Sequence, residues 1–320
     1  MWGNAMAEAA PERWSHPAAI LVATDLSDLD RLMPFALAQA AQTGAQLILL
    51  HVIALTEAIS ADMAGMPYYD PAGALDAASR ALEAACQHAR KHDVVCDALV
   101  REGHAAQQVL SAARQFHADR ILLGTRSRGK VSRLLIGSVA EQVLRSVNTP
   151  VITVGPEAHL PVEGSRPEKV VLHATTLRET SRPSAALASR VAGSLGARLI
   201  LLHVLPHIPE MQRRGEPTGL DSAAMQELRA MAEEVSRGCE VPIEPHVVHG
   251  NPAIEILAEA AGRRAELIVL GATQHSGFEN LTRDGTVYKV LAHARCPVMT
   301  LREPQGAEQS AAQHIATHAG

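Results

Sequence analysis

The sequence predicts an α/β fold built from two similar domains, each with a parallel sheet covered by helices on both faces. Its short apolar runs are mostly continuous rather than alternating, which is typical of strands buried on both faces of a parallel sheet. Alanine-rich helical segments separate these runs, and strict strand–helix alternation is typical of a doubly wound sheet. The segment LILLHV begins at Leu47 and again at Leu199, a step of 152 residues. A repeat as long as a whole domain predicts a duplicated domain.

Each copy is expected to hold five strands with helices between them. The strands of the first copy are predicted at 18–24, 47–53, 94–100, 120–124 and 150–154. Its helices are predicted near 28–43, 73–91, 104–117 and 138–147. The strands of the second copy are predicted at 169–175, 199–205, 243–249, 267–271 and 297–301. We therefore divide the chain into a first domain over 18–155, a Pro- and Gly-rich linker over 156–168, a second domain over 169–303 and a flexible tail over 304–320.

The composition describes a globular protein with enough apolar residues for two cores: 47% are hydrophobic, 20% are charged, and the net charge is −5. An acidic chain with only 2% aromatic residues is not typical of nucleic-acid binding, so we expect no nucleic-acid partner. The N-terminus does not resemble a secretory signal, and no apolar run reaches membrane-spanning length. We expect a cytoplasmic protein that does not contact a membrane.

The cysteines and histidines do not form a recognisable metal motif. The four cysteines have no close paired spacing, which favours reduced thiols in the core over a disulfide framework or a zinc site. His88 and His92 are four residues apart on a predicted helix, but a third ligand is not visible. We predict no metal site. His51 and His203 end the repeated LILLHV and are interpreted as hydrogen-bonded histidines at the rim of each sheet.

The loop after the fourth strand of the first copy is suited to an anion. From Gly124 it reads GTRSRGKVSRLLIGSVAEQVL, with four cations and no acid over 124–138, and it opens a helix at Gly137. Backbone N–H groups next to glycine and the positive end of a helix bind phosphate well. The stretch from Gly124 to Lys130 also fits the first seven positions of a P-loop. Val131 replaces the hydroxyl residue that would hold Mg²⁺, so a P-loop is not predicted.

The loop after the first strand, ATDLSDLD, places Asp25 just beyond the strand end. A carboxylate there can accept hydrogen bonds from a ribose or an adenine amino group. The alternative is that Asp25 caps the following helix, although Ser27 and Asp28 are also available as caps.

Together, VATDLSD, GAQLILLHV and GTRSRGKVSRLLIGSVAEQVLRSVNTPVITV resemble the universal stress protein family, and both copies share the resemblance. It implies a tandem member with Rossmann-like domains of strand order 3-2-1-4-5, and ATP as the ligand, with or without Mg²⁺. In nucleotide-binding members the fourth-strand loop reads G-x2-G-x9-G-[S/T] and closes over the phosphates. Gly124, Gly137 and Ser138 match this pattern, whereas Ser127 stands at the second glycine.

The resemblance further implies the contacts within the first copy. Asp25 would contact the adenosine, the Val52 backbone would read the adenine edge, and the glycines would surround ribose and phosphates. The full predicted set is Thr24, Asp25, Val52, Gly124, Thr125, Ser127, Arg128, Gly137, Ser138 and Val139.

The second copy departs from this pattern. Thr176 stands where the first copy has Asp25, and Gln274 replaces the second glycine. Without a gap, Asp284 falls opposite Gly137; a one-residue slip would instead align Gly285 and Thr286 with Gly137 and Ser138. Residues 271–285 hold one arginine against two acids, a net charge of −1. A negative loop repels a triphosphate, so the second copy is not expected to bind ATP.

The function that follows is a stress-response regulatory or signalling module that binds one adenine nucleotide per chain. One alternative is a nucleotide-independent scaffold or chaperone-like protein. Another is an ATPase, which would be slow because no catalytic signature is apparent. Family members commonly dimerise through the last strand. We therefore expect the two copies to pair across a pseudo-two-fold axis, and consider a homodimer and an unidentified protein partner.

Overall fold

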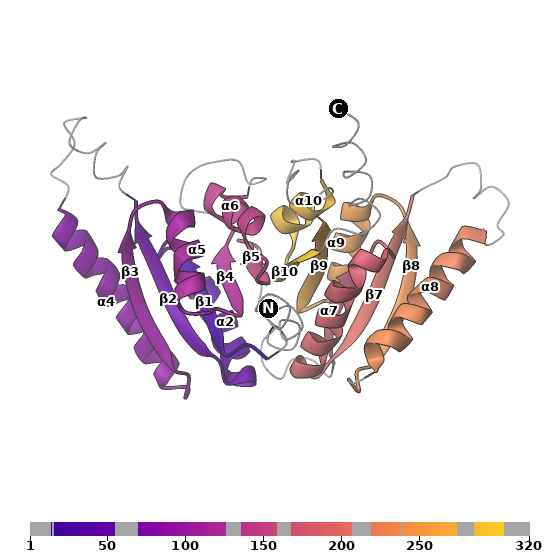
Figure 1. Ribbon diagram of the computed structural model, residues 1–320, viewed down its shortest axis with the longest axis horizontal. Coiled ribbons are helices and arrows are strands. Elements are labelled where there is room, and N and C mark those ends of the chain that lie inside the picture. Colours follow the sequence, from indigo (N-terminus) through magenta and orange to yellow (C-terminus); the bar gives the residue numbers. More distant parts are fainter. Residues whose placement is uncertain are drawn as a thin grey trace, which may run out of the picture. The chain divides into compact units, whose positions relative to one another are not determined.

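The computed structural model describes residues 14, 16–54, 70–125, 136–158, 168–206, 219–237, 239–273 and 285–303. The chain divides into two compact units, Met1–Leu160 and Pro161–Gly320, both shown in Figure 1. Most of the predicted linker and the whole predicted tail lie outside the described residues.

Unit 1 holds a parallel sheet in the order β3-β2-β1-β4-β5 (Figure 1). Its strands are β1 (Ala19–Thr24), β2 (Gln46–Ile53), β3 (Cys96–Glu102), β4 (Arg120–Gly124) and β5 (Val151–Val154). The predicted α/β fold class and the strand order 3-2-1-4-5 are confirmed. The order reverses between β1 and β4, so the connections on either side of this pair run in opposite directions.

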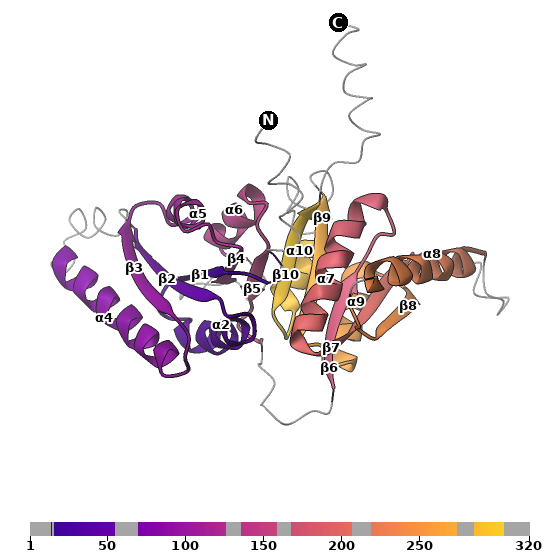
Figure 2. The same cartoon turned by 60° about the horizontal axis from the view of Figure 1, so that its bottom comes forward.

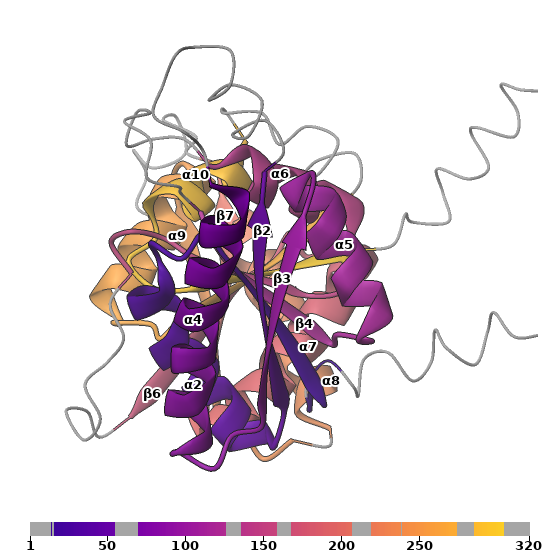
Figure 3. The same cartoon turned by 90° about the vertical axis from the view of Figure 1, so that its left-hand side faces the viewer.

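The helices of unit 1 cover both faces of this sheet. They are α2 (Leu29–Thr43), α4 (Pro71–Arg90), α5 (Ala105–Gln115) and α6 (Ser138–Ser146). Figures 2 and 3 show α2 and α4 on one face and α5 and α6 on the other. Because both faces are covered, the central strand residues are almost fully buried, for example Leu21 and Leu49. This explains the continuous apolar runs in the sequence.

Unit 2 repeats the arrangement with the order β8-β7-β6-β9-β10. Its strands are β6 (Lys169–Ala174), β7 (Ala197–Leu205), β8 (Ile243–His249), β9 (Leu267–Thr273) and β10 (Val298–Glu303). The helices are η1 (Glu179–Ser181), α7 (Arg182–Leu195), α8 (Gly219–Ser236), α9 (Pro252–Gly262) and α10 (Thr286–His293). Helix α7 packs beside α8, and α9 packs beside α10.

The ends of corresponding helices show how the duplication preserved local structure. Gly44 directly follows the last residue of α2 and Gly196 directly follows that of α7, with φ angles of 72° and 60°. In both glycines the backbone is left-handed, a conformation that strains residues with a Cβ atom. Each glycine lets the chain turn directly into the next strand.

One expectation about the cysteines is wrong. Cys86 on α4 and Cys96 at the start of β3 form a disulfide, with Cα atoms 5.1 Å apart, and both are buried. The sequence does not show this pairing because only the packing of α4 on β3 brings the two side chains together. Cys239 and Cys296 are free thiols, and burial raises the pKa of Cys296 to about 12.

Neither a membrane-spanning helix nor a metal-binding cluster is present within the described ranges. None of the helices there combines the length and the apolar character needed to cross a bilayer. No group of three or more metal-ligating side chains comes together in the same part of the chain. His88 and His92 contact each other edge to face, with ring centroids 4.9 Å apart.

Candidate functional site

The candidate site is the carboxyl edge of the unit 1 sheet, where the strand order reverses between β1 and β4. In open α/β sheets, ligands bind outside this edge. Thr24 ends β1, Val52 lies near the end of β2, and Gly124 ends β4. The predicted residues Asp25, Thr125, Gly137, Ser138 and Val139 directly follow these strands or begin α6. Ser127 and Arg128 lie outside the described residues.

Asp25 lies in a tight turn after β1. Its Oδ1 accepts hydrogen bonds from the Ser27 backbone N–H at 2.9 Å and from the Ser27 hydroxyl at 2.5 Å. Leu26 has a φ angle of 71°, and its N–H donates to the Thr24 hydroxyl at 2.9 Å. The alternative that Asp25 caps α2 is not realised, since the N-cap position belongs to Asp28. The half-buried Asp25 is thus held by one carboxylate oxygen, and the contacts within the described chain leave Oδ2 for a ligand.

Asp28 is a site residue that the sequence reasoning treated only as a spare cap. Its side chain makes no capping hydrogen bond; instead Oδ1 accepts a 2.5 Å hydrogen bond from the Thr24 hydroxyl. The other oxygen faces the Gly124 backbone, where an added Cβ would collide with it. Asp28 is only 5% exposed, and burial raises the pKa of this carboxyl above its usual 3.8. Only the four-residue spacing of Thr24 and Asp28 hinted at the contact.

The start of α6 offers backbone donors at the same edge. Gly137 is the N-cap, with φ −63° and ψ 146°, and within the described chain no side chain caps the helix there. Its own N–H donates to the Thr125 carbonyl at 2.7 Å, which fixes the helix end against the strand end. The following N–H groups and the helix dipole favour an anion at this point.

Thr125 adds a second polar group beside this helix end. The residue is 2% exposed, and its hydroxyl oxygen has no hydrogen-bond partner within the described chain. A buried hydroxyl without a partner is costly, and a ligand oxygen that hydrogen-bonds to it removes that cost.

The repeated histidines have the structural role that the sequence suggested. His51 Nδ1 lies 3.0 Å from the Thr24 carbonyl, and His203 Nδ1 lies 2.9 Å from the Thr175 carbonyl. Each joins the ends of the first two strands of its unit. The interpretation as hydrogen-bonded rim histidines is confirmed.

Unit 2 preserves the shape of the first loop but not its acid. The Leu177 N–H donates to the Thr175 hydroxyl at 3.2 Å, and Leu177 has a φ angle of 60°, as its counterpart does in unit 1. Thr176 replaces the aspartate, and its hydroxyl contacts that of Ser181 at 2.7 Å. The carboxylate acceptor is therefore absent from this loop while the backbone turn remains.

The counterpart of Asp28 also differs. Glu179 extends into solvent, 83% exposed, and forms an ion pair with Arg182 at 2.6 Å. The hydrogen bond from Arg182 lowers the pKa of this carboxyl. Unit 1 therefore carries a buried carboxylate beside its fourth strand, and unit 2 carries a solvated ion pair.

The start of α10 decides between the two alignments of the last loop. Gly285 is the N-cap, with φ −72° and ψ 149°, nearly the angles of Gly137. Gly285 and Thr286 therefore correspond to Gly137 and Ser138, and the ungapped alignment that placed Asp284 opposite Gly137 is wrong. The preceding loop, 274–284, lies outside the described residues.

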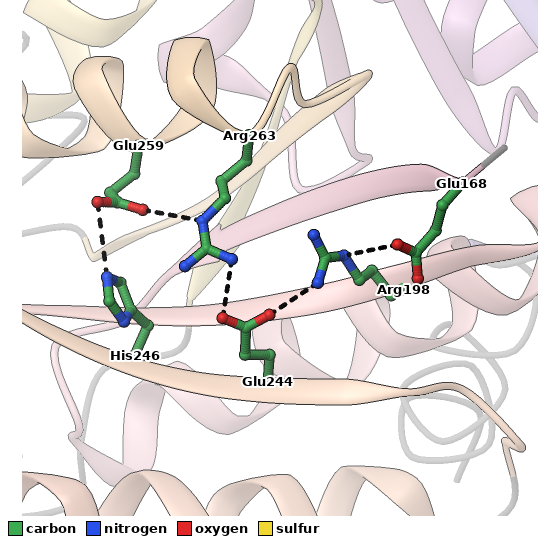
Figure 4. A network of polar contacts seen from close by, with 6 residues as sticks. All are labelled: Glu168, Arg198, Glu244, His246, Glu259 and Arg263. Carbon is green, nitrogen blue, oxygen red and sulfur yellow. Dashed lines mark hydrogen bonds and ion pairs between the residues drawn. The ribbon is translucent and has the colours of Figure 1, made fainter. Parts of the chain in front are cut away.

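A second polar cluster, in unit 2, is internally paired (Figure 4). Glu244 on β8 contacts Arg198 at 2.9 Å and Arg263 at 2.8 Å, and the chain of contacts continues to Glu168 and to Glu259, which faces His246. In unit 1 the matching strand positions hold a single Gln46–Asp97 hydrogen bond of 2.5 Å. The unit 2 network links β7, β8 and α9. Its charged side chains form ion pairs with one another.

The fold and this edge define the class: two tandem doubly wound α/β domains. Where the strand order reverses, the first domain carries a carboxylate and a helix start that no described side chain caps. The Universal stress protein family pattern matches residues 18–155 and 168–302. The chain therefore belongs to the universal stress protein family.

Known relatives agree with this assignment. A universal stress protein from Mycolicibacterium smegmatis is 26% identical over 299 residues, which cover 88% of this chain and 96% of the relative. One from Mycobacterium tuberculosis is 28% identical over 193 residues, so the chain spans 62% of that relative's length. The crystal structure of a universal stress protein from Archaeoglobus fulgidus has a TM-score of 0.69 at 21% identity, covers 90% of this chain and 97% of its own, and shows the same fold.

Proposed function

We propose that unit 1 binds one adenine nucleotide, with ATP as the predicted ligand, and that binding regulates a stress response in the cytoplasm. The observation that carries the proposal is the start of α6, which no described side chain caps and which lies beside the Thr125 hydroxyl, itself without a hydrogen-bond partner among the described residues. These groups suit phosphate. Asp25 offers Oδ2 to a ribose hydroxyl or an adenine amino group.

The two ends of the nucleotide would be bound by different elements. The first loop and the end of β2, with Asp25 and the Val52 backbone, would hold the adenosine. The N–H groups of Ser138 and Val139 would face the phosphates, with Ser127 and Arg128 of the basic loop as further predicted contacts. Mg²⁺, if it accompanies ATP, would neutralise phosphate charge.

Unit 2 has no part in this binding. It lacks the aspartate of the first loop, and its last loop has a net charge of −1 by sequence. We infer that unit 2 is a partner domain that retains the fold without the nucleotide. Pairing of the two copies and homodimer formation stay predictions from the sequence.

A calorimetric titration of nucleotide-stripped full-length protein with ATP and Mg²⁺ tests whether unit 1 binds the nucleotide. Gly137→Asp places a negative charge where the phosphates are expected, and aspartate is a good N-cap, so the helix should remain folded. A Cβ at Gly137 would stand 3.3 Å from the Thr125 carbonyl oxygen, which requires a shift of only a few tenths of an ångström. We expect one ATP per wild-type chain and loss of binding in the variant.

Two controls separate charge from shape and unit 1 from unit 2. Gly137→Asn has nearly the same size and capping ability without the charge, so its affinity relative to that of Gly137→Asp isolates the effect of the charge. Gly285→Asp makes the same change at the corresponding helix of unit 2 and should leave ATP binding unchanged. Absence of ATP binding by the wild type would reject the proposal and favour a nucleotide-independent scaffold.

A further inference from the structure

The buried carboxylate of Asp28 is the feature of the site that nucleotide binding does not require. Oδ1 is fixed by the Thr24 hydroxyl at 2.5 Å, and Thr24 in turn accepts a hydrogen bond from the Leu26 N–H. Oδ2 lies against the backbone of Gly124, the first glycine of the basic loop, and the Asp28 Cγ is 3.3 Å from the position of an added Cβ. The carboxylate therefore lies directly behind the strand end from which that loop starts.

Among the described residues, the charges around Asp28 only partly balance its negative charge. From the first loop, Asp25 is a second negative charge that disfavours ionisation of Asp28. From α2, the Arg31 guanidinium is 4.0 Å away and favours ionisation. On β2, His51 is the nearby titratable group, and its Nδ1 is directed to the Thr24 carbonyl. Within the described residues, the end of β4 supplies only the uncharged Gly124 and Thr125; the basic residues that follow lie outside the described ranges. Burial is the largest influence on Asp28 and opposes its charged form.

We propose that Asp28 sets the charge preference of the unit 1 site. An ionised, buried carboxylate beside Gly124 repels phosphate more strongly than a solvated one, because little water lies between the charges. The carboxylate then lowers the affinity for a triphosphate more than that for a monophosphate, and leaves the affinity for uncharged adenosine unchanged. Binding of a triphosphate is accompanied by proton uptake at Asp28. The inference rests on the proposed adenine-nucleotide site and adds to it a residue that discriminates by ligand charge.

Unit 2 provides a natural comparison. Glu179 occupies the corresponding position but is exposed and paired with Arg182. Its charge is screened by water and by its partner, so it should not influence a ligand. Glu179→Gln is therefore a matched control for Asp28→Asn.

The experiment is a calorimetric titration of the full chain with adenosine, AMP and magnesium-bound ATP at pH 6, 7 and 8. Asparagine has the size of aspartate and can still accept the Thr24 hydrogen bond, so Asp28→Asn removes the charge with little change of shape. We expect Asp28→Asn to tighten ATP binding at pH 8 by roughly tenfold, AMP by less and adenosine not at all. The advantage over wild type should shrink as the pH falls, because the raised pKa of Asp28 lets the wild type gain this proton more easily at lower pH.

A second measurement needs no variant. Repeating the wild-type titration in buffers of different ionisation enthalpy counts the protons taken up, and we expect uptake with magnesium-bound ATP and none with adenosine. Equal ATP affinity in wild type and Asp28→Asn, with no proton uptake, would overturn the inference and leave the nucleotide site standing. Loss of adenosine together with ATP in Asp28→Asn would also overturn it. Failure of the wild type to bind any of the three ligands would reject both proposals.

Discussion

His173 shows how one substitution between the copies changes the chemistry of a core. It lies one residue before the end of β6, at the position of Val22 in β1, and is completely buried. Its Nδ1 donates to the Val269 carbonyl at 3.0 Å, while Nε2 has no hydrogen-bond partner within the described chain. Burial lowers the pKa of this imidazole to about 4, so the ring is neutral at physiological pH.

The stability of unit 2 should therefore depend on pH between the unfolded and folded pKa values of His173. As the pH falls from about 6.5 to about 4, the unfolded chain binds a proton that the folded unit excludes. We expect a loss of about 3 kcal/mol over this window. His173→Val, which copies unit 1, should remove most of that dependence in urea unfolding at pH 7 and pH 4. Exposed His88→Gln is the control; an unchanged slope in His173→Val would contradict the assignment.

At the scale of elements, α4 is fastened to β3 by covalent and polar contacts. The Cys86–Cys96 disulfide joins the last turns of the helix to the first residue of the strand. Next to it, the Arg90 guanidinium donates to the Cys96 carbonyl at 2.6 Å and to Glu83 at 2.7 Å. These contacts hold a helix that lies at one end of the unit 1 sheet, beside the edge strand.

Removal of the disulfide should destabilise unit 1. For so short a loop, the chain-entropy estimate is about 2–3 kcal/mol. Cys86→Ala with Cys96→Ala should lower the melting temperature, and a reducing agent should lower that of the wild type but not of the double variant. Cys239→Ser, at a free and half-buried thiol, is the control. A count of four free thiols in the unreduced, denatured wild type would show that the disulfide does not form.

At the scale of the whole molecule, the duplication gives two copies of one fold. The copies differ in the side chains at the carboxyl edge of each sheet. Both retain the turn after the first strand, the rim histidine and the glycine at the last helix. Only unit 1 adds Asp25 and the buried Asp28. The backbone elements common to a fold are thus preserved while the side chains proposed to meet a ligand have diverged.

This asymmetry predicts where ATP will protect the chain. In hydrogen–deuterium exchange, ATP should slow exchange at the ends of β1 and β4 and at the start of α6. The corresponding segments of unit 2, after β6 and at the start of α10, should not change. The same protocol on Gly137→Asp should show no protection in either unit, and equal protection of both units would mean that unit 2 binds nucleotide too.

Much of this structure follows from sequence because its causes are local or repetitive. Continuous apolar runs mark strands buried on both faces, and β4 and β8 begin and end where the pattern predicts. The repeated LILLHV identifies the duplication, and glycine after the first helix of each copy marks its end. The predicted third strand of unit 1 begins two residues early, because Val94 and Val95 are apolar but precede the pairing that forms β3.

Only the tertiary structure decided which distant side chains meet. Asp28 looked like a helix cap, but folding places it against Gly124, nearly a hundred residues away, and under the Thr24 hydroxyl. The Cys86–Cys96 pairing and the correspondence of Gly285 with Gly137 likewise required coordinates. The physical reason is that a sequence pattern shows which positions of a helix or strand face the core. A hydrogen bond, a disulfide or a close approach depends instead on how whole elements are placed relative to one another.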